Sequence, residues 1–189
     1  MSAAILAGGR ARRLSGRDKS RLIIDGQTII HRQLDVLQRI TPDIFIVSSF
    51  VSRYGDLPIP AYPDVVPASG AMGGLLTALE RASSPLVLVI ACDLPFLTRT
   101  LLQAVGDAAG TGDGAWVRSP RGIEPLVACY RRAVRFALRG EILAGRLALA
   151  GLGAVLRMTP VDVAEQSVFG ASTRLLANVN TADDYDRLQ

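Results

Sequence analysis

Cysteine and histidine are almost absent from this sequence of 189 residues. It contains two cysteines, Cys92 and Cys129, and a single histidine, His31. Two thiols form no disulfide framework and supply too few ligands for a structural zinc site. His31 falls in an expected helix and is interpreted as a surface or packing residue. A Ser-His-Asp or Cys-His mechanism therefore has little to build on.

Aromatic residues are also scarce, at 5% of the chain, and long apolar runs are missing. No run reaches the roughly 18 residues of a membrane span. The first residues lack the basic n-region of a signal peptide, so we expect a cytoplasmic protein without a membrane partner. The net charge is +4, but few aromatics leave few platforms for stacked bases. Locally clustered arginines favour a small anionic ligand, such as a nucleotide, over nucleic acid.

Hydrophobic residues make up 49% of the chain and charged residues 20%, which is ample material for a core. The length suits one domain spanning residues 1–189. Strands are expected at 3–6, 44–48, 86–91, 114–119, 125–132 and 154–158, with an extended piece at 21–25. Helices are expected at 29–40, 72–82, 98–109, 133–139 and 181–188. This alternation predicts a Rossmann-like three-layer α/β/α fold with a mostly parallel sheet.

Ligands of such sheets bind beyond the carboxyl ends of the strands. The stretch "LAGGRARRLSGRDK" follows the first expected strand directly. Gly8 and Gly9 let main-chain N–H groups approach an anion closely. Arg13 and Lys19 add positive charge suited to phosphate oxygens. The stretch matches neither the Walker A nor the G-x-G-x-x-G pattern. The alternative interpretation is a flexible basic loop at the surface.

A carboxylate follows the strongly apolar strand in "LVLVIACDLPFL". Asp93 would face the ligand crevice, where a hard oxygen ligand suits Mg²⁺, an ion that uses only one or two protein carboxylates. The alternative is that Asp93 caps the next helix. Thr98 is better placed for that cap. Cys92 beside Asp93 is interpreted as a small buried residue.

These motifs resemble a known family. The loop from Leu6 to Lys19 resembles the signature of nucleotidyltransferases with a glycosyltransferase-A-like α/β fold. Its L-A-G-G start and D-K end are most similar to the molybdenum cofactor guanylyltransferases of the MobA family. The segments "CDLP" and "NVNTADDY" resemble that family's metal-binding loop and C-terminal motif.

The resemblance implies a set of site residues. GTP-binding positions would be Leu6, Ala7, Gly8, Gly9, Lys19, Ser48, Asp64, Gly70, Gly74 and Asp93. Ser48 stands where the family often has Asn, and the Gly70–Gly74 segment lacks the family's Pro. Asn180 would reach the metal or the acceptor, and Thr181 with Asp184 would cap the last helix. Arg121 would meet the acceptor phosphate, although Arg121, Arg131 and Arg132 suit a solvated surface equally well.

The resemblance implies an enzyme that transfers GMP from GTP to the phosphate of molybdopterin and releases pyrophosphate. Arg13, Lys19 and Asp93 would be catalytic, with Mg²⁺ on Asp93. Other proteins of cofactor biosynthesis are candidate partners. One alternative keeps the chemistry: a cytidylyltransferase for the same cofactor, or a sugar-phosphate nucleotidyltransferase. Gly8 favours GTP, because members that use CTP more often read L-A-A-G. A second alternative is a nucleotide-binding adaptor without turnover.

Overall fold

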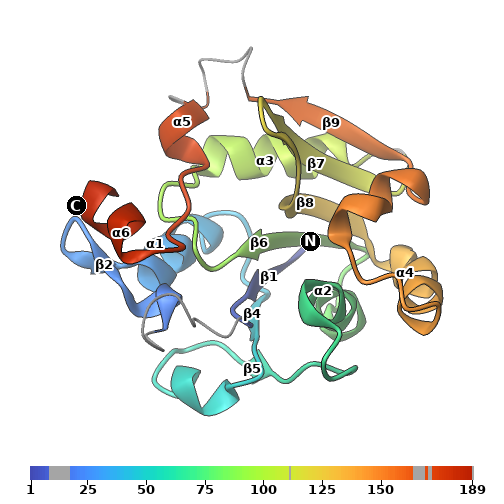
Figure 1. The fold of residues 1–189 in the computed structure, drawn as a ribbon, viewed down its shortest axis with the longest axis horizontal. Coiled ribbons are helices and arrows are strands. Elements are labelled where there is room, and N and C mark those ends of the chain that lie inside the picture. The colour runs from blue at the N-terminus through green and yellow to red at the C-terminus, as the bar shows by residue number, and fades with distance from the viewer. Residues whose placement is uncertain (9–17, 111, 164–168, 170–171, 189) are drawn as a thin grey trace.

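The computed structural model describes residues 1–8, 18–110, 112–163, 169 and 172–188, and Figure 1 shows their arrangement. The strands are β1 Ser2–Leu6, β2 Ile23–Ile24, β3 Gln27–Thr28, β4 Ile44–Val47, β5 Ala61–Tyr62, β6 Leu86–Ala91, β7 Gly114–Ser119, β8 Gly122–Arg131 and β9 Met158–Asp162. The α-helices are α1 Ile29–Leu37, α2 Gly70–Arg81, α3 Arg99–Ala108, α4 Arg135–Leu143, α5 Ser172–Leu175 and α6 Ala182–Leu188. Short 3-10 helices span Lys19–Arg21, Val51–Tyr54, Arg132–Val134 and Leu149–Ala154.

The described strands form a seven-stranded sheet in the order β5-β4-β1-β6-β8-β7-β9, beside a small β2-β3 hairpin. In the large sheet, β8 runs antiparallel to its neighbours β6 and β7. The other pairs in it are parallel. The sheet is therefore mostly parallel, as the alternating pattern predicts. The strand at residues 86–91 is parallel to β1 only, since its other neighbour is β8.

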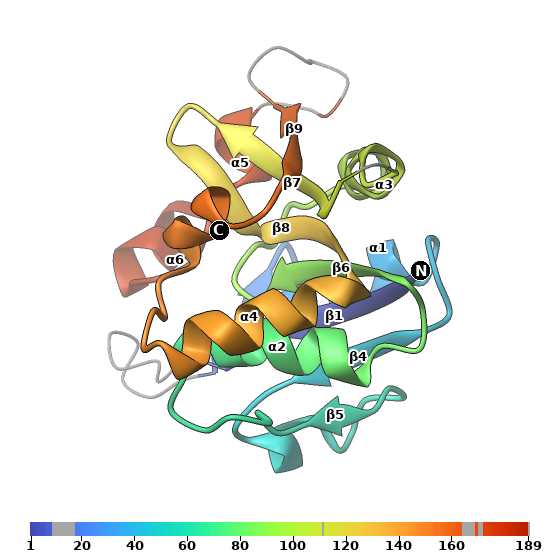
Figure 2. The ribbon, with the colours of Figure 1, turned by 90° about the vertical axis from the view of Figure 1, so that its right-hand side faces the viewer.

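Helices cover both faces of the sheet (Figures 1 and 2). Side chains alternate along β1: Ala3 and Ile5 pack with α1 and α3, whereas Ala4 and Leu6 pack with α2 and α4. All five residues of β1 are buried, which suits a parallel strand covered on both sides. The predicted three-layer α/β/α architecture is confirmed. No described helix combines the length and apolar character that a membrane crossing requires.

Helix caps at the site end of the sheet agree with the sequence. Thr98 is the N-cap of α3, and its Oγ1 accepts a hydrogen bond from the Leu101 N–H at 3.3 Å. Asp93 is therefore not needed as that cap. Before α6, the Asp184 N–H donates to Thr181 Oγ1 at 3.1 Å, and the Thr181 N–H donates to Asp184 Oδ2 at 2.9 Å. This reciprocal pair is the predicted capping box.

The prediction of a strand at residues 154–158 is wrong. Residues Leu149–Ala154 form a 3-10 helix, and β9 begins only at Met158. The reason is helical spacing: Leu152 and Leu156 are both buried, and the Leu156 N–H donates to the Leu152 carbonyl at 2.9 Å. β9 is the edge strand of the sheet, which tolerates the missing N–H of its Pro160.

The extended piece expected at 21–25 is shorter in the structure, which places β2 at Ile23–Ile24 after the 3-10 turn Lys19–Arg21. Asp18 causes that turn because its side chain accepts a hydrogen bond from the Ser20 N–H. The predicted turn at Asp25 and Gly26 is present. Both residues have positive φ, 49° and 78°, as a tight hairpin between β2 and β3 requires.

We predict opposite effects for two glycine substitutions in helices. A Cβ at Gly73 in α2 would lie 2.9 Å from Ser69 Cβ and 3.0 Å from the Val66 carbonyl oxygen. Gly73→Ala should therefore destabilise the fold by about 1–3 kcal/mol through overpacking. A Cβ at Gly140 in α4 would meet nothing within 4 Å. Gly140→Ala should stabilise the fold by up to about 1 kcal/mol. Urea unfolding measures both, and a Gly73→Ala protein as stable as the parent would contradict the packing at this site.

Candidate functional site

A hollow of about 190 Å³ lies where the strands β1 and β6 end. The described residues that line it are Leu6, Ala7, Gly8, Asp18, Lys19, Arg53, Ala91, Cys92, Asp93 and Leu126. The start of the glycine loop and the acidic turn meet here because β1 and β6 pair in parallel, with Leu6 opposite Ala91. Residues that the sequence places on separate loops therefore share one cavity.

Lys19 forms the polar centre of this hollow. Its Nζ lies 3.4 Å from Asp93 Oδ2 and 2.5 Å from Asn180 Oδ1. The side chains of Lys19 and Asp93 are 22% and 20% exposed, so a ligand can still reach them. Lys19 is also the only lysine among the chain's 21 Lys and Arg residues. The one compact ammonium of the sequence therefore stands where its oxygen partners from two other segments converge.

Main-chain hydrogen bonds fix these segments against one another. The Cys92 N–H donates to the Leu6 carbonyl at 3.1 Å, and the Val179 N–H donates to the Asp93 carbonyl at 3.0 Å. The Asn180 N–H donates to Asp184 Oδ2 at 3.0 Å. Hydrogen bonds from the Thr181 hydroxyl and the Asn180 backbone lower the pKa of Asp184. The cap of α6 thus positions Asn180 beside Lys19. The sequence predicts a buried Cys92, but this residue is only half-buried and lines the hollow, because it follows the last residue of β6 directly. Desolvation raises the pKa of its thiol, so the thiol stays protonated near neutral pH.

The turn that carries Lys19 is held by the 3-10 helix Val51–Tyr54. The Tyr54 hydroxyl donates to Asp18 Oδ2 at 3.0 Å, and burial raises the pKa of Tyr54. Arg21 donates to both carboxylate oxygens of Asp56, at 2.8 and 2.5 Å. Arg53, from the same helix, lines the hollow. The sequence reasoning missed Arg53 and Tyr54. Their position just after β4, at the carboxyl edge of the sheet, is the signal that could have found them.

Two further predicted nucleotide positions lie beside Leu6, the last residue of β1. A Cβ at Gly74 would be 3.5 Å from Leu6 Cδ1 and 3.7 Å from Asp64 Oδ1, so Leu6, Asp64 and Gly74 are neighbours. Ser49 Oγ donates to Asp64 Oδ2 at 3.2 Å. Partial burial raises the pKa of Asp64, because desolvation disfavours its charged form.

The predicted positions Ser48 and Gly70 have different surroundings. Ser48 is 1% exposed; its Oγ donates to the Ala7 carbonyl at 3.1 Å and accepts from the Phe50 N–H at 3.1 Å. Its contact is thus with the main chain of Ala7, directly after β1. Gly70 is the exposed first residue of α2, with a φ of 57°. Ser69 before it makes no side-chain cap, so its hydroxyl does not occupy the N–H groups of the first turn of α2.

The predicted acceptor arginines separate into two groups. Arg121 lies in the β7–β8 turn at the same end of the sheet as Asp93, because β8 starts where β6 ends. Its side chain is 61% exposed and lies 3.6 Å from Glu124, while Nη2 donates to the Leu176 carbonyl at 3.0 Å. Arg131 pairs with Leu86, the first residue of β6, at the opposite end.

At that opposite end, Arg131 donates to the carbonyls of Gly110 and Gly112, and Arg132 donates to the Leu79 carbonyl. The two residues therefore bind main chain away from the hollow. Two other predicted residues, Gly9 and Arg13, lie outside the described residues.

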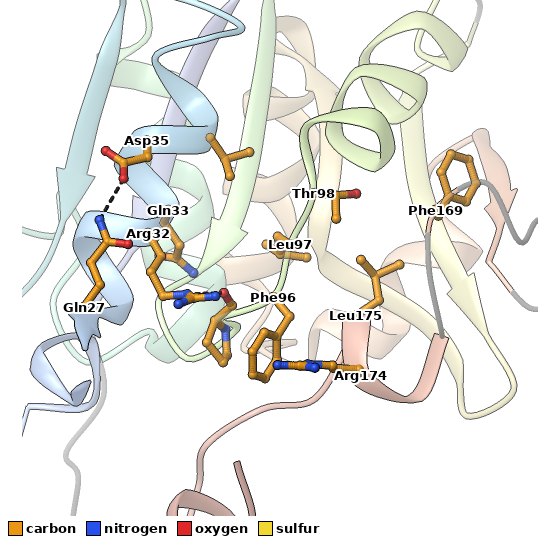
Figure 3. Close-up of a pocket in the computed structure, with 12 residues that line it drawn as sticks. Gln27, Arg32, Gln33, Asp35, Phe96, Leu97, Thr98, Phe169, Arg174 and Leu175 are labelled. Atoms are coloured by element: carbon orange, nitrogen blue, oxygen red, sulfur yellow. Dashed lines mark hydrogen bonds between the residues drawn. The ribbon is translucent and has the colours of Figure 1, made fainter. Parts of the chain in front are cut away.

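A larger hollow, of about 500 Å³, lies behind the acidic turn between α1, residues 95–98 and α5 (Figure 3). The Phe96 ring there lies between the guanidinium groups of Arg32 and Arg174, at 5.5 and 4.5 Å from the ring centroid. Asp25 lies 3.6 and 3.7 Å from these two arginines. None of the predicted site residues lines this hollow. This larger hollow is therefore distinct from the predicted site and lies on the outer side of the turn that carries Asp93.

The donor set at the smaller hollow suits a hard cation. Asp93 and Asn180 present oxygen atoms to the same point, the Lys19 ammonium. Carboxylate and amide oxygens fit Mg²⁺, which completes its shell with water and substrate oxygens. Within the described part of the chain, no three His, Cys, Asp or Glu side chains gather as a metal cluster.

Comparison with known proteins shows which family this chain is similar to. The model of the family described as "MobA-like NTP transferase domain" matches residues 3–163. A "Probable molybdenum cofactor guanylyltransferase" of Chloroflexus aggregans is 32% identical over all of this chain and 93% of the relative. A second protein of that name, from Clostridium perfringens, is 25% identical over 99% of this chain and 95% of its own length. The crystal structure of molybdopterin-guanine dinucleotide biosynthesis protein A from Archaeoglobus fulgidus superposes with a TM-score of 0.81, at 25% identity, covering 100% of this chain and 96% of that one.

We predict that Asp64→Asn stabilises the protein near neutral pH. Burial raises the pKa of Asp64, so folding favours its neutral form and the ionised form costs stability as pH rises through the native pKa. Because the carboxylate is partly solvated, the gain should stay below about 1 kcal/mol. Melting temperatures at about pH 7 and about pH 4, near the ordinary pKa of aspartate, measure it.

Asp56→Asn is the matched control. Hydrogen bonding to Arg21 lowers the pKa of Asp56, so its contribution is present above the ordinary aspartate range and is lost as pH falls. This substitution should therefore lower the melting temperature at pH 7. For both variants, the difference in melting temperature from the parent should become smaller towards pH 4. If both substitutions raised, or both lowered, the melting temperature at pH 7, the electrostatics described here would be contradicted.

Proposed function

This chain belongs to the MobA-like NTP transferase domain family, and we propose that it transfers GMP from GTP to the phosphate of molybdopterin, with release of pyrophosphate and dependence on Mg²⁺. Its relatives named molybdenum cofactor guanylyltransferase support this substrate pair. The observation that carries the proposal is the convergence of Lys19, Asp93 and Asn180 at the end of the glycine loop.

Repulsion between two anions is the main obstacle in this reaction. An acceptor phosphate must approach the α-phosphorus of a triphosphate, so positioning and charge neutralisation supply most of the catalysis. Lys19 lines the hollow beside Gly8 and has a flexible stem, so its ammonium can exchange the 3.4 Å contact with Asp93 for phosphate oxygens. The N–H groups of Gly8 and of the first turn of α2 would add positive dipoles.

Asp93 would hold Mg²⁺, with Asn180 Oδ1 close enough to share the metal or to contact the acceptor. When bound, the metal would neutralise phosphate charge and align the reacting groups. Asp93 suits this task because two hydrogen bonds fix its main chain, from the Cys92 N–H to the Leu6 carbonyl and from the Val179 N–H to the Asp93 carbonyl. Its side chain lines the hollow and contacts Lys19. Leu6, Asp64 and Gly74 would bind the nucleoside, and Arg121 would extend the positive surface towards the acceptor.

The proposed chemistry requires no general base. A phosphate monoester is already largely ionised near neutral pH and can attack directly. The single histidine lies elsewhere: His31 is exposed on α1, with Nδ1 2.6 Å from Thr28 Oγ1. The absence of a poised imidazole from the hollow's described lining is thus compatible with transfer.

We predict that Asp93→Asn and Lys19→Met each lower kcat by about 100- to 1,000-fold, the usual effect of removing one electrostatic contact to the transition state. Pyrophosphate release from GTP with the pterin acceptor, at several Mg²⁺ concentrations, measures the rate. Glu80→Gln is the control, because Glu80 pairs with Arg139 from the last turn of α2, at the opposite end of that helix from Gly70, and is not among the described residues that line the hollow. Near-normal turnover by either site variant would contradict the proposed mechanism. A protein that binds GTP without turnover would instead be an adaptor.

We predict that GTP is the preferred nucleotide. With the same acceptor, kcat/KM for GTP should exceed that for CTP and UTP by at least about tenfold, because a pocket that hydrogen-bonds one base leaves polar groups unpaired with another. Preference for CTP would identify a cytidylyltransferase. Activity with UTP and a sugar phosphate in place of the pterin would identify a sugar-phosphate nucleotidyltransferase.

A further inference from the structure

We propose that Gln33, on α1, is a positioning residue that holds the turn carrying Asp93. This inference rests on the proposed function only for its effect on turnover. Gln33 is 2% exposed, and its Nε2 donates to the Ala91 carbonyl at 2.8 Å and to the Leu94 carbonyl at 3.0 Å. One amide group thus bridges the residues on either side of Cys92 and Asp93. Figure 3 shows its side chain extending from α1 towards this segment.

The two hydrogen bonds from Gln33 lie where the main chain changes direction. Ala91 is the last residue of β6, and the chain leaves the sheet after it. A primary amide can donate two hydrogen bonds from one nitrogen, which joins two carbonyl groups without any charge. Clamping the carbonyls of Ala91 and Leu94 together restricts the turn and therefore the direction of the Asp93 side chain between them.

The oxygen of the Gln33 amide is in an environment that reduces the stability of the fold. This oxygen, Oε1, is buried and has no hydrogen-bond partner among the described residues. A buried acceptor without a partner reduces stability. The two hydrogen bonds that Gln33 donates offset this cost, and both end on the turn that carries the site carboxylate.

Neighbouring contacts hold the same turn from other directions. Arg32, adjacent on α1, donates from Nε to the Pro95 carbonyl at 3.1 Å. The Val179 N–H donates to the Asp93 carbonyl at 3.0 Å. Gln33 holds the turn from the inner side, between the sheet and the turn, whereas Arg32 and Val179 hold it from other directions. Losing it should loosen the turn without changing the hollow's opposite wall, which is formed by Leu6, Ala7 and Gly8.

Gln33→Met tests the proposal, since methionine has nearly the same length and donates no hydrogen bond. Gln38→Met is the matched control: it makes the same chemical change at an exposed residue that follows α1. Two measurements use the free protein. Amide hydrogen exchange of Val179 reports on its bond to Asp93. A ¹⁵N-lysine spectrum contains one side-chain signal, because Lys19 is the only lysine, and that signal reports on the contact with Asp93.

We expect Gln33→Met to speed exchange at Val179 about tenfold, shift the Lys19 signal and weaken Mn²⁺ binding about tenfold, in line with two lost hydrogen bonds. The melting temperature should stay within a few degrees of the parent. In turnover, kcat should fall about tenfold with little change in KM for GTP, because the nucleotide wall is intact. Gln38→Met should match the parent in each measurement.

A folded Gln33→Met protein with parental Val179 exchange and Lys19 signal would overturn the proposal. If this variant does not fold, Gln33→Asn retains an amide that is too short to bridge both carbonyls, and the same changes are expected. Unfolding of both variants would make Gln33 a general core residue and would also overturn the proposal. The spectra need no substrate, so a parent protein that fails to convert GTP would refute the proposed function and leave this test standing.

Discussion

The ammonium group of Lys19 joins three segments that are far apart in the sequence, and the rest of the site is arranged around it. Asp93 and Asn180 lie 74 and 161 residues further along the chain, yet both contact the same nitrogen. A charge in this position attracts carboxylate, amide and phosphate oxygens alike. The proposed reaction needs that property, because its reactants are anions and its metal is held by oxygen.

Hydrogen bonds from three other parts of the fold hold these groups in position. Tyr54 holds the turn of Lys19 through Asp18, the cap of α6 holds Asn180, and Gln33 bridges the turn of Asp93. Two features carry a cost in stability: the partly buried carboxylate of Asp64 and the unpaired Oε1 of Gln33. Both lie next to groups assigned to the site. Functional sites often retain such unfavourable groups because the arrangement that binds a substrate is not the one that packs best.

Much of the fold could be predicted from local patterns, and the errors have local causes. Apolar runs located the strands of the parallel sheet, and Thr98 and Thr181 located helix starts. The segment 149–158 misled because small apolar residues suit a strand and a tight helix equally. Only the packing of Leu152 and Leu156 against the sheet decides between them. Arg53 and Tyr54 carry no motif, so their contribution became visible only when the segment after β4 was seen beside the turn of Lys19.

The sequence by itself determined the chemical groups and the end of the sheet at which they lie, because a residue that directly follows a parallel strand must emerge at its carboxyl edge. It also determined the family through its motifs. Only the tertiary structure decided which groups touch. It paired Lys19 with Asp93 and Asn180, turned Ser48 towards the Ala7 carbonyl, and separated Arg131 from Arg121. Such contacts depend on strand order and register, which bring together residues that no local pattern relates.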